Sequence, residues 1–150
     1  MSSNAKTTGI ALVLGIGPKA ETSPRAKAVA LMLAAHGVAV VVMGEHERSL
    51  GEVVGEMVYG GGRARHVVGD VRVAEHVGGA IDKALGVFGE GRFLVVAFSE
   101  TEALPQTMAA VGSALGSRGL SADVLFLGPP DRAEEPEKLA QRVASFVAFS

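Results

Sequence analysis

Two glycines, Gly15 and Gly17, stand directly after an apolar run near the start of the chain. Glycines at this spacing let the backbone turn tightly and approach a pyrophosphate, whose charge then rests on N–H groups at the next helix start. The third glycine of the full dinucleotide pattern is absent, because Ala20 stands in its place. The segment therefore indicates either a dinucleotide-binding loop or a simple tight turn.

Two acidic residues follow later apolar runs, at positions where an adenosine could be held. Glu45 comes after the second run, where a carboxylate can accept hydrogen bonds from a ribose; the alternative is a solvated helix start. Asp70 ends the third run and either caps a helix beginning at Arg72, contacts an adenine, or does both. Because a carboxylate beside the ribose would repel a 2′-phosphate, Glu45 favours NAD over NADP.

Ser99 and Glu100 follow the fourth apolar run and are the candidate catalytic residues. With Asp70 and His46 they offer proton transfer to an apolar substrate, since an apolar cleft raises the pKa of a carboxyl group. Ser99 equally fits a helix cap. The four histidines have no pair four residues apart, so they predict no metal site.

Five short apolar runs are typical of strands buried on both faces, because the apolar residues do not alternate with polar ones. They cover residues 10–14, 38–43, 66–68, 93–98 and 124–127. Helical segments lie between them. The best marked of these spans residues 24–36, with Ser23 as N-cap, Pro24 as first helical residue and Gly37 just past its end.

The other helical segments are recognised by apolar faces with a helical period. These faces comprise Leu50, Val53, Val54, Met57 and Val58; Val73, Val77, Ile81, Leu85 and Phe88; Leu104, Met108, Val111 and Leu115; and Leu139, Val143 and Phe146. Strands that alternate with helices predict a three-layer α/β fold, with a mostly parallel five-stranded sheet and helices on both faces. Ligands of such sheets lie beyond the carboxyl ends of the strands, where the strand order reverses.

The composition excludes several classes of protein. A chain of 150 residues is the size of one domain, and we expect a single domain after a polar lead at residues 1–8. The formal charge of −2 leaves no basic surplus for a nucleic acid, and the absence of cysteine excludes disulfides and thiolate metal sites. No apolar run is long enough for a signal peptide or a membrane span, so we expect a cytoplasmic protein.

Several segments together resemble the short-chain dehydrogenase/reductase family. The matching segments are residues 11–18, 30–42, 69–71 and 84–89. The resemblance implies a Rossmann-like fold, NAD or NADP as cofactor, and a homo-oligomer associated through its helices. It also implies that a dinucleotide contacts Gly15, Gly17, Glu45, Asp70 and Val71.

The chain also departs from that family. Its fourth strand, residues 94–99, is not followed by the family's Asn-Asn-Ala-Gly motif. Residues 108–116 look like the family's active-site helix, but Val111 stands at the position of the catalytic Tyr and Leu115 at that of the Lys. The single tyrosine, Tyr59, is expected in the turn before the third strand, far from the cleft, as a packing residue with its hydroxyl in water.

These features favour a shortened, reductase-like protein that lacks the Tyr/Lys pair and is not a competent oxidoreductase. It would bind a dinucleotide or another small molecule at the strand ends, and whether it catalyses a reaction stays open. One alternative is a non-redox enzyme, such as an isomerase, cyclase or dehydratase. Another is a protein-interaction or dimerisation module, whose apolar faces around Val111 and Phe146 have lost covering chain.

Overall fold

The computed structural model describes residues 9–16, 23–89, 93–98, 104–120 and 122–127. Strands and helices alternate along these residues. In chain order they are β1 (Ile10–Ile16), α1 (Ser23–Ala35), β2 (Ala39–Gly44), α2 (Glu47–Tyr59), β3 (Ala64–Val68), α3 (Ala74–Phe88), β4 (Phe93–Phe98), α4 (Leu104–Ser117) and β5 (Ala122–Leu127). None of these helices is both long and apolar enough to cross a membrane.

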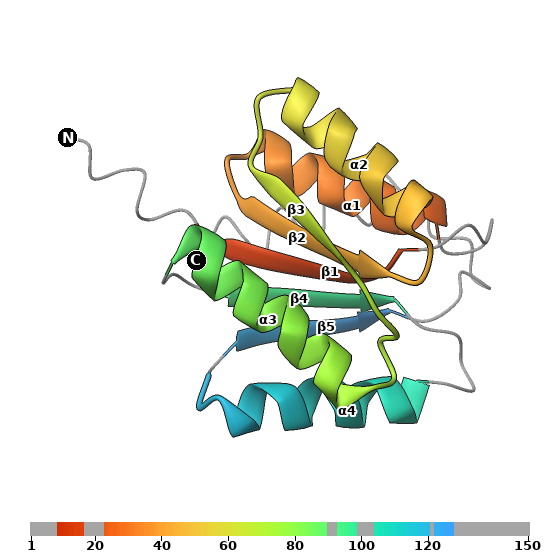
Figure 1. Cartoon of the computed structure of the whole chain (residues 1–150), viewed down its shortest axis with the longest axis vertical. Helices are drawn as coiled ribbons and strands as arrows, with labels where there is room; N and C mark the ends of the chain where they lie inside the picture. Colours follow the sequence, from red (N-terminus) through yellow and green to blue (C-terminus); the bar gives the residue numbers. More distant parts are fainter. Residues whose placement is uncertain (1–8, 17–22, 90–92, 99–103, 121, 128–150) are drawn as a thin grey trace.

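The five strands form one sheet in the order β3-β2-β1-β4-β5, and every neighbouring pair is parallel. Helices α1 and α2 cover one face of the sheet, and α3 and α4 cover the other (Figure 1). The three-layer α/β fold predicted from the sequence is thereby confirmed. From β1 the chain continues outward through β2 to β3, and it then crosses back to β4, which pairs with the other side of β1. The strand order therefore reverses between β1 and β4, at whose carboxyl ends such sheets bind ligands.

The central strands are buried on both faces, as their unbroken apolar sequences predict. Every residue of β2 is buried, because helices of both layers pack across it. The same prediction is wrong for β3, which lies at the edge of the sheet. There Arg65 is exposed and Val68 is 50% exposed, since the helix layers do not cover the rim completely.

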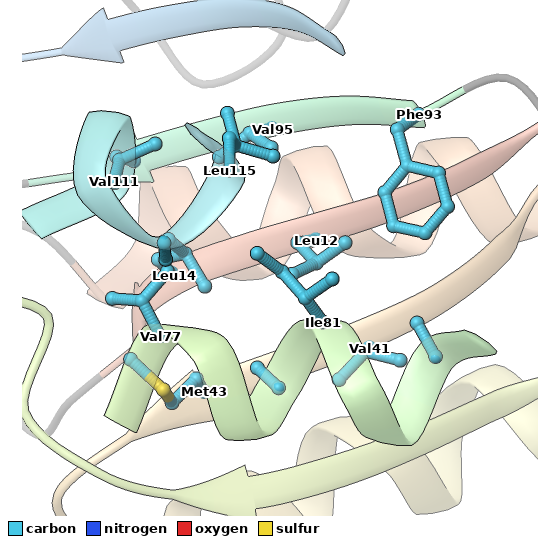
Figure 2. Close-up of a cluster of buried hydrophobic side chains, with 14 of the residues drawn as sticks. Leu12, Leu14, Val41, Met43, Val77, Ile81, Phe93, Val95, Val111 and Leu115 are labelled. Carbon is cyan, nitrogen blue, oxygen red and sulfur yellow. The ribbon is translucent and has the colours of Figure 1, made fainter. Parts of the chain in front are cut away.

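The core between the sheet, α3 and α4 is built from aliphatic side chains (Figure 2). Leu12 and Leu14 of β1 meet Val77 and Ile81 of α3. Helix α4 completes this core with one buried face, whose residues are spaced three or four apart along the helix. They are Thr107, Ala110, Val111, Ala114 and Leu115. The buried face of α4 includes Thr107 and not Met108, whose side chain is 47% exposed, so the predicted core position of Met108 is wrong.

The core on the other face is formed by α1 and α2. Leu33 of α1 and Leu50, Val53 and Met57 of α2 are buried there, but Val58 is 51% exposed, so its predicted core position is wrong. Helix α1 ends at Ala35, one residue before the predicted end, and Gly37 follows two residues later with a φ of +85°, a conformation that favours glycine after a helix. Helix α1 begins at Ser23 itself, so the prediction of Ser23 as N-cap and Pro24 as first helical residue is late by one residue. The side chain of Ser23 and the helix predicted around Val143 lie outside the described residues.

Candidate functional site

Gly15 forms the first part of the candidate site, at the carboxyl end of β1. The register with β2 shifts between Leu14, which pairs with Met43, and Ile16, which pairs with Gly44. Gly15 is the extra residue of this bulge and has a φ of +94°, a conformation that residues with a Cβ adopt only under strain. The backbone therefore bends where the sequence predicts a tight turn. Gly17 lies outside the described residues.

Glu45 follows the last residue of β2, at the same edge of the sheet. Helix α2 begins at Glu47, and its N-cap is His46, which makes no side-chain capping hydrogen bond. Glu45 thus stands before the first helical turn and does not belong to it. Its side chain is 59% exposed, so its carboxylate is accessible from the carboxyl edge of the sheet.

Asp70 shapes the turn between β3 and α3. The Val73 N–H donates to the Asp70 carbonyl at 3.0 Å, and the Arg72 N–H donates to the Asp70 Oδ1 at 2.8 Å. Helix α3 starts only at Ala74, and its N-cap residue is Val73. The prediction that Asp70 caps a helix beginning at Arg72 is therefore wrong: the carboxylate closes a turn ahead of the helix, a common role of aspartate.

The same carboxylate binds the side chain of Arg72. The Arg72 Nε donates to Oδ1 at 2.9 Å, and its Nη2 donates to Oδ2 at 2.7 Å. These hydrogen bonds lower the pKa of Asp70 to about 2, although partial burial of the carboxyl group opposes the shift. Asp70 is therefore ionised at neutral pH and presents a fixed carboxylate.

The turn also lies close to the start of helix α3. The Asp70 N–H donates to the His76 Nδ1 at 2.9 Å, which requires that ring nitrogen to be unprotonated. A Cβ on Gly69 would lie 3.0 Å from the His76 Cβ and 3.1 Å from the Met43 Sδ, so a larger residue here would push these side chains aside by a few tenths of an ångström. Between these contacts the Val71 N–H donates no hydrogen bond to any described residue, and Val71 is partly exposed.

Sequence reasoning missed Arg72 and His76 as parts of this site. Arg72 stands two residues after an aspartate that follows a strand, which is the spacing of an aspartate turn and could have indicated the contact. His76 had no such signal, because its contact with the Asp70 N–H depends on how α3 lies against the end of β3. The candidate catalytic residues Ser99 and Glu100 lie outside the described residues.

The match of residues 108–116, in α4, to an active-site helix is wrong, as the packing of this helix shows. Val111 and Leu115 are 1% and 8% exposed and point into the core of Figure 2. A side chain that transfers protons to a substrate must reach a cleft, so these two positions do not correspond to a catalytic Tyr and Lys. The apolar face around Val111 is also covered, contrary to prediction, and Phe146 lies outside the described residues.

Tyr59 is the last residue of α2, at the amino end of the sheet and away from Asp70. Its distance from the carboxyl edge is as predicted. Its predicted packing role is wrong, because it is 94% exposed. Among the described residues, no three histidine, aspartate or glutamate side chains come together as metal ligands.

No protein-family model and no curated protein matches the sequence. Solved structures do match the fold. A short-chain type dehydrogenase/reductase from Mycobacterium marinum has a TM-score of 0.62 and 21% identity, and the match covers 81% of this chain and 56% of that one. A metagenomic short-chain oxidoreductase in complex with NADP has a TM-score of 0.67 and 16% identity, with 95% and 91% covered. A variant of the actinorhodin polyketide ketoreductase with NADPH has a TM-score of 0.63 and 15% identity, with 94% and 63% covered.

These matches define the class of the fold. The protein has the Rossmann-like fold of the short-chain dehydrogenases/reductases, as the sequence resemblance implies. The chain spans little more than half the length of the M. marinum protein and most of the length of the metagenomic one.

Proposed function

We propose that this protein binds a nicotinamide dinucleotide at the carboxyl edge of its sheet, with the adenosine half at Glu45, Asp70 and Val71. The turn at Asp70 is the observation that carries the proposal. Two of the solved proteins that share the fold are complexes with NADP and NADPH. Parallel α/β sheets bind nucleotides at this edge because helix starts and strand ends converge there.

The chemistry of the turn fits an adenine. Adenine presents an amino donor next to ring-nitrogen acceptors. The ionised Asp70 carboxylate is a matching acceptor, and the neighbouring Val71 N–H is a donor that makes no hydrogen bond within the described part of the chain. Glu45 would accept hydrogen bonds from the ribose, and the bend at Gly15 lets the backbone pass close to the ligand.

When bound, the nicotinamide ring would supply hydride-transfer chemistry. This chain's own residues would orient the adenosine half, but they supply no tyrosine for the proton transfer that accompanies a reductase reaction. Tyr59 is the only tyrosine among the 150 residues, and it ends α2 at the opposite end of the sheet. We therefore propose dinucleotide binding without tyrosine-dependent oxidoreductase activity, and Glu100 stays the candidate for any acid/base step.

The test is a titration with NADH and NADPH, followed by nucleotide fluorescence and by thermal unfolding. Binding to the folded state alone raises the free energy of unfolding by about 2.7 kcal/mol at a ligand concentration of about 100 Kd. The Val71→Pro variant removes the amide donor at a turn position that proline favours, while Val71→Ala keeps the donor. We expect weaker nucleotide binding for Val71→Pro only.

A second pair of variants tests the bend in β1. Gly15→Ala and Gly37→Ala both place a Cβ at a positive φ, so both should lose stability by roughly 1 kcal/mol. Gly37 follows α1, at the amino end of the sheet, and is the matched control. Only Gly15→Ala should weaken nucleotide binding. Wild-type protein that binds neither nucleotide at millimolar concentration would contradict the proposed function.

A further inference from the structure

Arg72 joins the two acidic residues of the candidate site. It comes from the turn after β3, and Glu45 comes from the end of β2. The Arg72 Nη2 lies 2.7 Å from the Asp70 Oδ2 and 3.8 Å from the Glu45 Oε2. The sequence favours NAD on the assumption that Glu45 acts alone. In the structure this carboxylate has a guanidinium beside it.

The position of this guanidinium is fixed by its other contacts. Its Nε and Nη2 bind the two oxygens of Asp70, and this paired geometry sets the plane of the group. The Arg72 N–H also binds Asp70 Oδ1, so backbone and side chain are anchored on the same carboxylate. Arg72 is 48% exposed even so, and its charge therefore reaches the solvent side of the edge where Glu45 lies.

We propose that Arg72 is a specificity-determining residue of the proposed nucleotide site: it offsets the charge of Glu45 and favours a nucleotide with a 2′-phosphate. This inference rests on the proposed function. The two side chains act in opposite directions on the same phosphate. Glu45 repels a 2′-phosphate and accepts hydrogen bonds from a free ribose hydroxyl, whereas an arginine beside it accommodates the phosphate.

Because Glu45 and Arg72 act oppositely on the 2′-phosphate, the two single variants should change the ratio of NADPH to NADH affinity in opposite directions. Arg72→Gln should weaken NADPH binding about tenfold and NADH binding by less than about threefold, since a hydrogen-bonded charge contributes about 1.5 kcal/mol or more. Glu45→Gln should raise the ratio of NADPH to NADH affinity about three- to tenfold on the same basis. The double variant should return the ratio toward the wild-type value, because it removes both charges.

Arg118 provides the matched control. Its Nε and Nη2 bind the two oxygens of Asp82 at 2.9 and 3.0 Å, in the same paired geometry, but between α3 and the end of α4. Arg118→Gln therefore loses an equivalent ion pair away from the carboxyl edge. It should lower stability and leave the ratio of NADPH to NADH affinity unchanged.

The experiment measures the dissociation constants of NADH and NADPH for the wild type and these four variants, at low and high salt. In the wild type, salt should weaken NADPH binding more than NADH binding, and this difference should shrink in Arg72→Gln. An unchanged affinity ratio in Arg72→Gln, or a larger loss for NADH than for NADPH, overturns the inference and leaves the proposed function standing. Absence of binding by both nucleotides in the wild type overturns both.

Discussion

Replacement of Asp70 by asparagine isolates the contribution of its charge to stability. The asparagine side chain is nearly isosteric, and its carbonyl oxygen can still accept the hydrogen bond from the Arg72 N–H that closes the turn. What is lost is the negative charge that binds the guanidinium of Arg72. The variant therefore keeps the local backbone and removes the ion pair.

The expected size follows from the pKa of Asp70, which is lowered from 3.8 to about 2 in the folded protein. Each pKa unit corresponds to about 1.36 kcal/mol, so the ionised carboxylate contributes at most about 2.5 kcal/mol. Arg72 is half exposed and solvent screens the pair, which reduces the expected contribution to about 1 to 2 kcal/mol. Because the folded pKa is the lower one, this stability is present above about pH 5 and is lost as the pH falls from about 4 to about 2.

Urea unfolding of both proteins across this pH range checks the prediction. The wild type should exceed Asp70→Asn by about 1 to 2 kcal/mol at neutral pH and by less than about 0.5 kcal/mol near pH 2. Asp82, whose pKa is also lowered by Arg118, titrates in both proteins, so its contribution cancels in the difference. A difference in the free energy of unfolding that stays constant with pH would refute the reasoning. At low pH the wild-type Asp70 is protonated and has no charge left for the variant to remove.

Further predictions concern the helices and Tyr59. Gly79→Ala should stabilise the protein by about 0.5 to 1 kcal/mol, because its Cβ meets open space and alanine favours a helix. Gly78→Ala should be at least about 0.5 kcal/mol less stable than Gly79→Ala in urea unfolding, since its Cβ would lie 2.6 Å from the Arg118 Nη2 and displace that ion pair. Ile81→Ala removes a fully buried side chain and should cost about 2 to 5 kcal/mol in the same assay. Tyr59→Phe should leave nucleotide affinity and stability within error, and a loss of binding would contradict the placement of the site.

Self-association is a separate prediction that the packing of α4 makes more specific. The face around Val111 is buried in the core, so a homo-oligomer would have to form through other surfaces. Light scattering at high concentration tests for an oligomer directly. A monomer at all concentrations would contradict the prediction of a homo-oligomer.

Much of the fold is predictable because it depends on local sequence. Unbroken apolar runs mark the central strands, where both faces need apolar cover, and β2 is buried throughout. Gly37 marks the end of α1 because a positive φ after a helix favours glycine whatever surrounds it. The bend at Gly15 has the same local cause.

The orientation of each element about its axis depends on its neighbours. A helical period in α4 fits a face that includes Met108, but contact with the sheet selects the face that contains Thr107 and Val111. Val111 and Leu115 belong to both faces and are buried, so the packing agrees with their place on the apolar face and not with the catalytic positions to which the sequence also matched them. β3 reads as fully buried, and only its place at the edge of the sheet exposes Val68.

The candidate site divides in the same way. The acidic residues Glu45 and Asp70 could be found from the sequence, because each follows an apolar run and parallel strands end at one edge. Their connection through Arg72 depends on β2 and β3 lying side by side, which brings Glu45 and Arg72, 27 residues apart in the chain, to within 3.8 Å. Types and positions of charged residues are local information, whereas the distances that decide how those charges act on a ligand arise only when the strands pair.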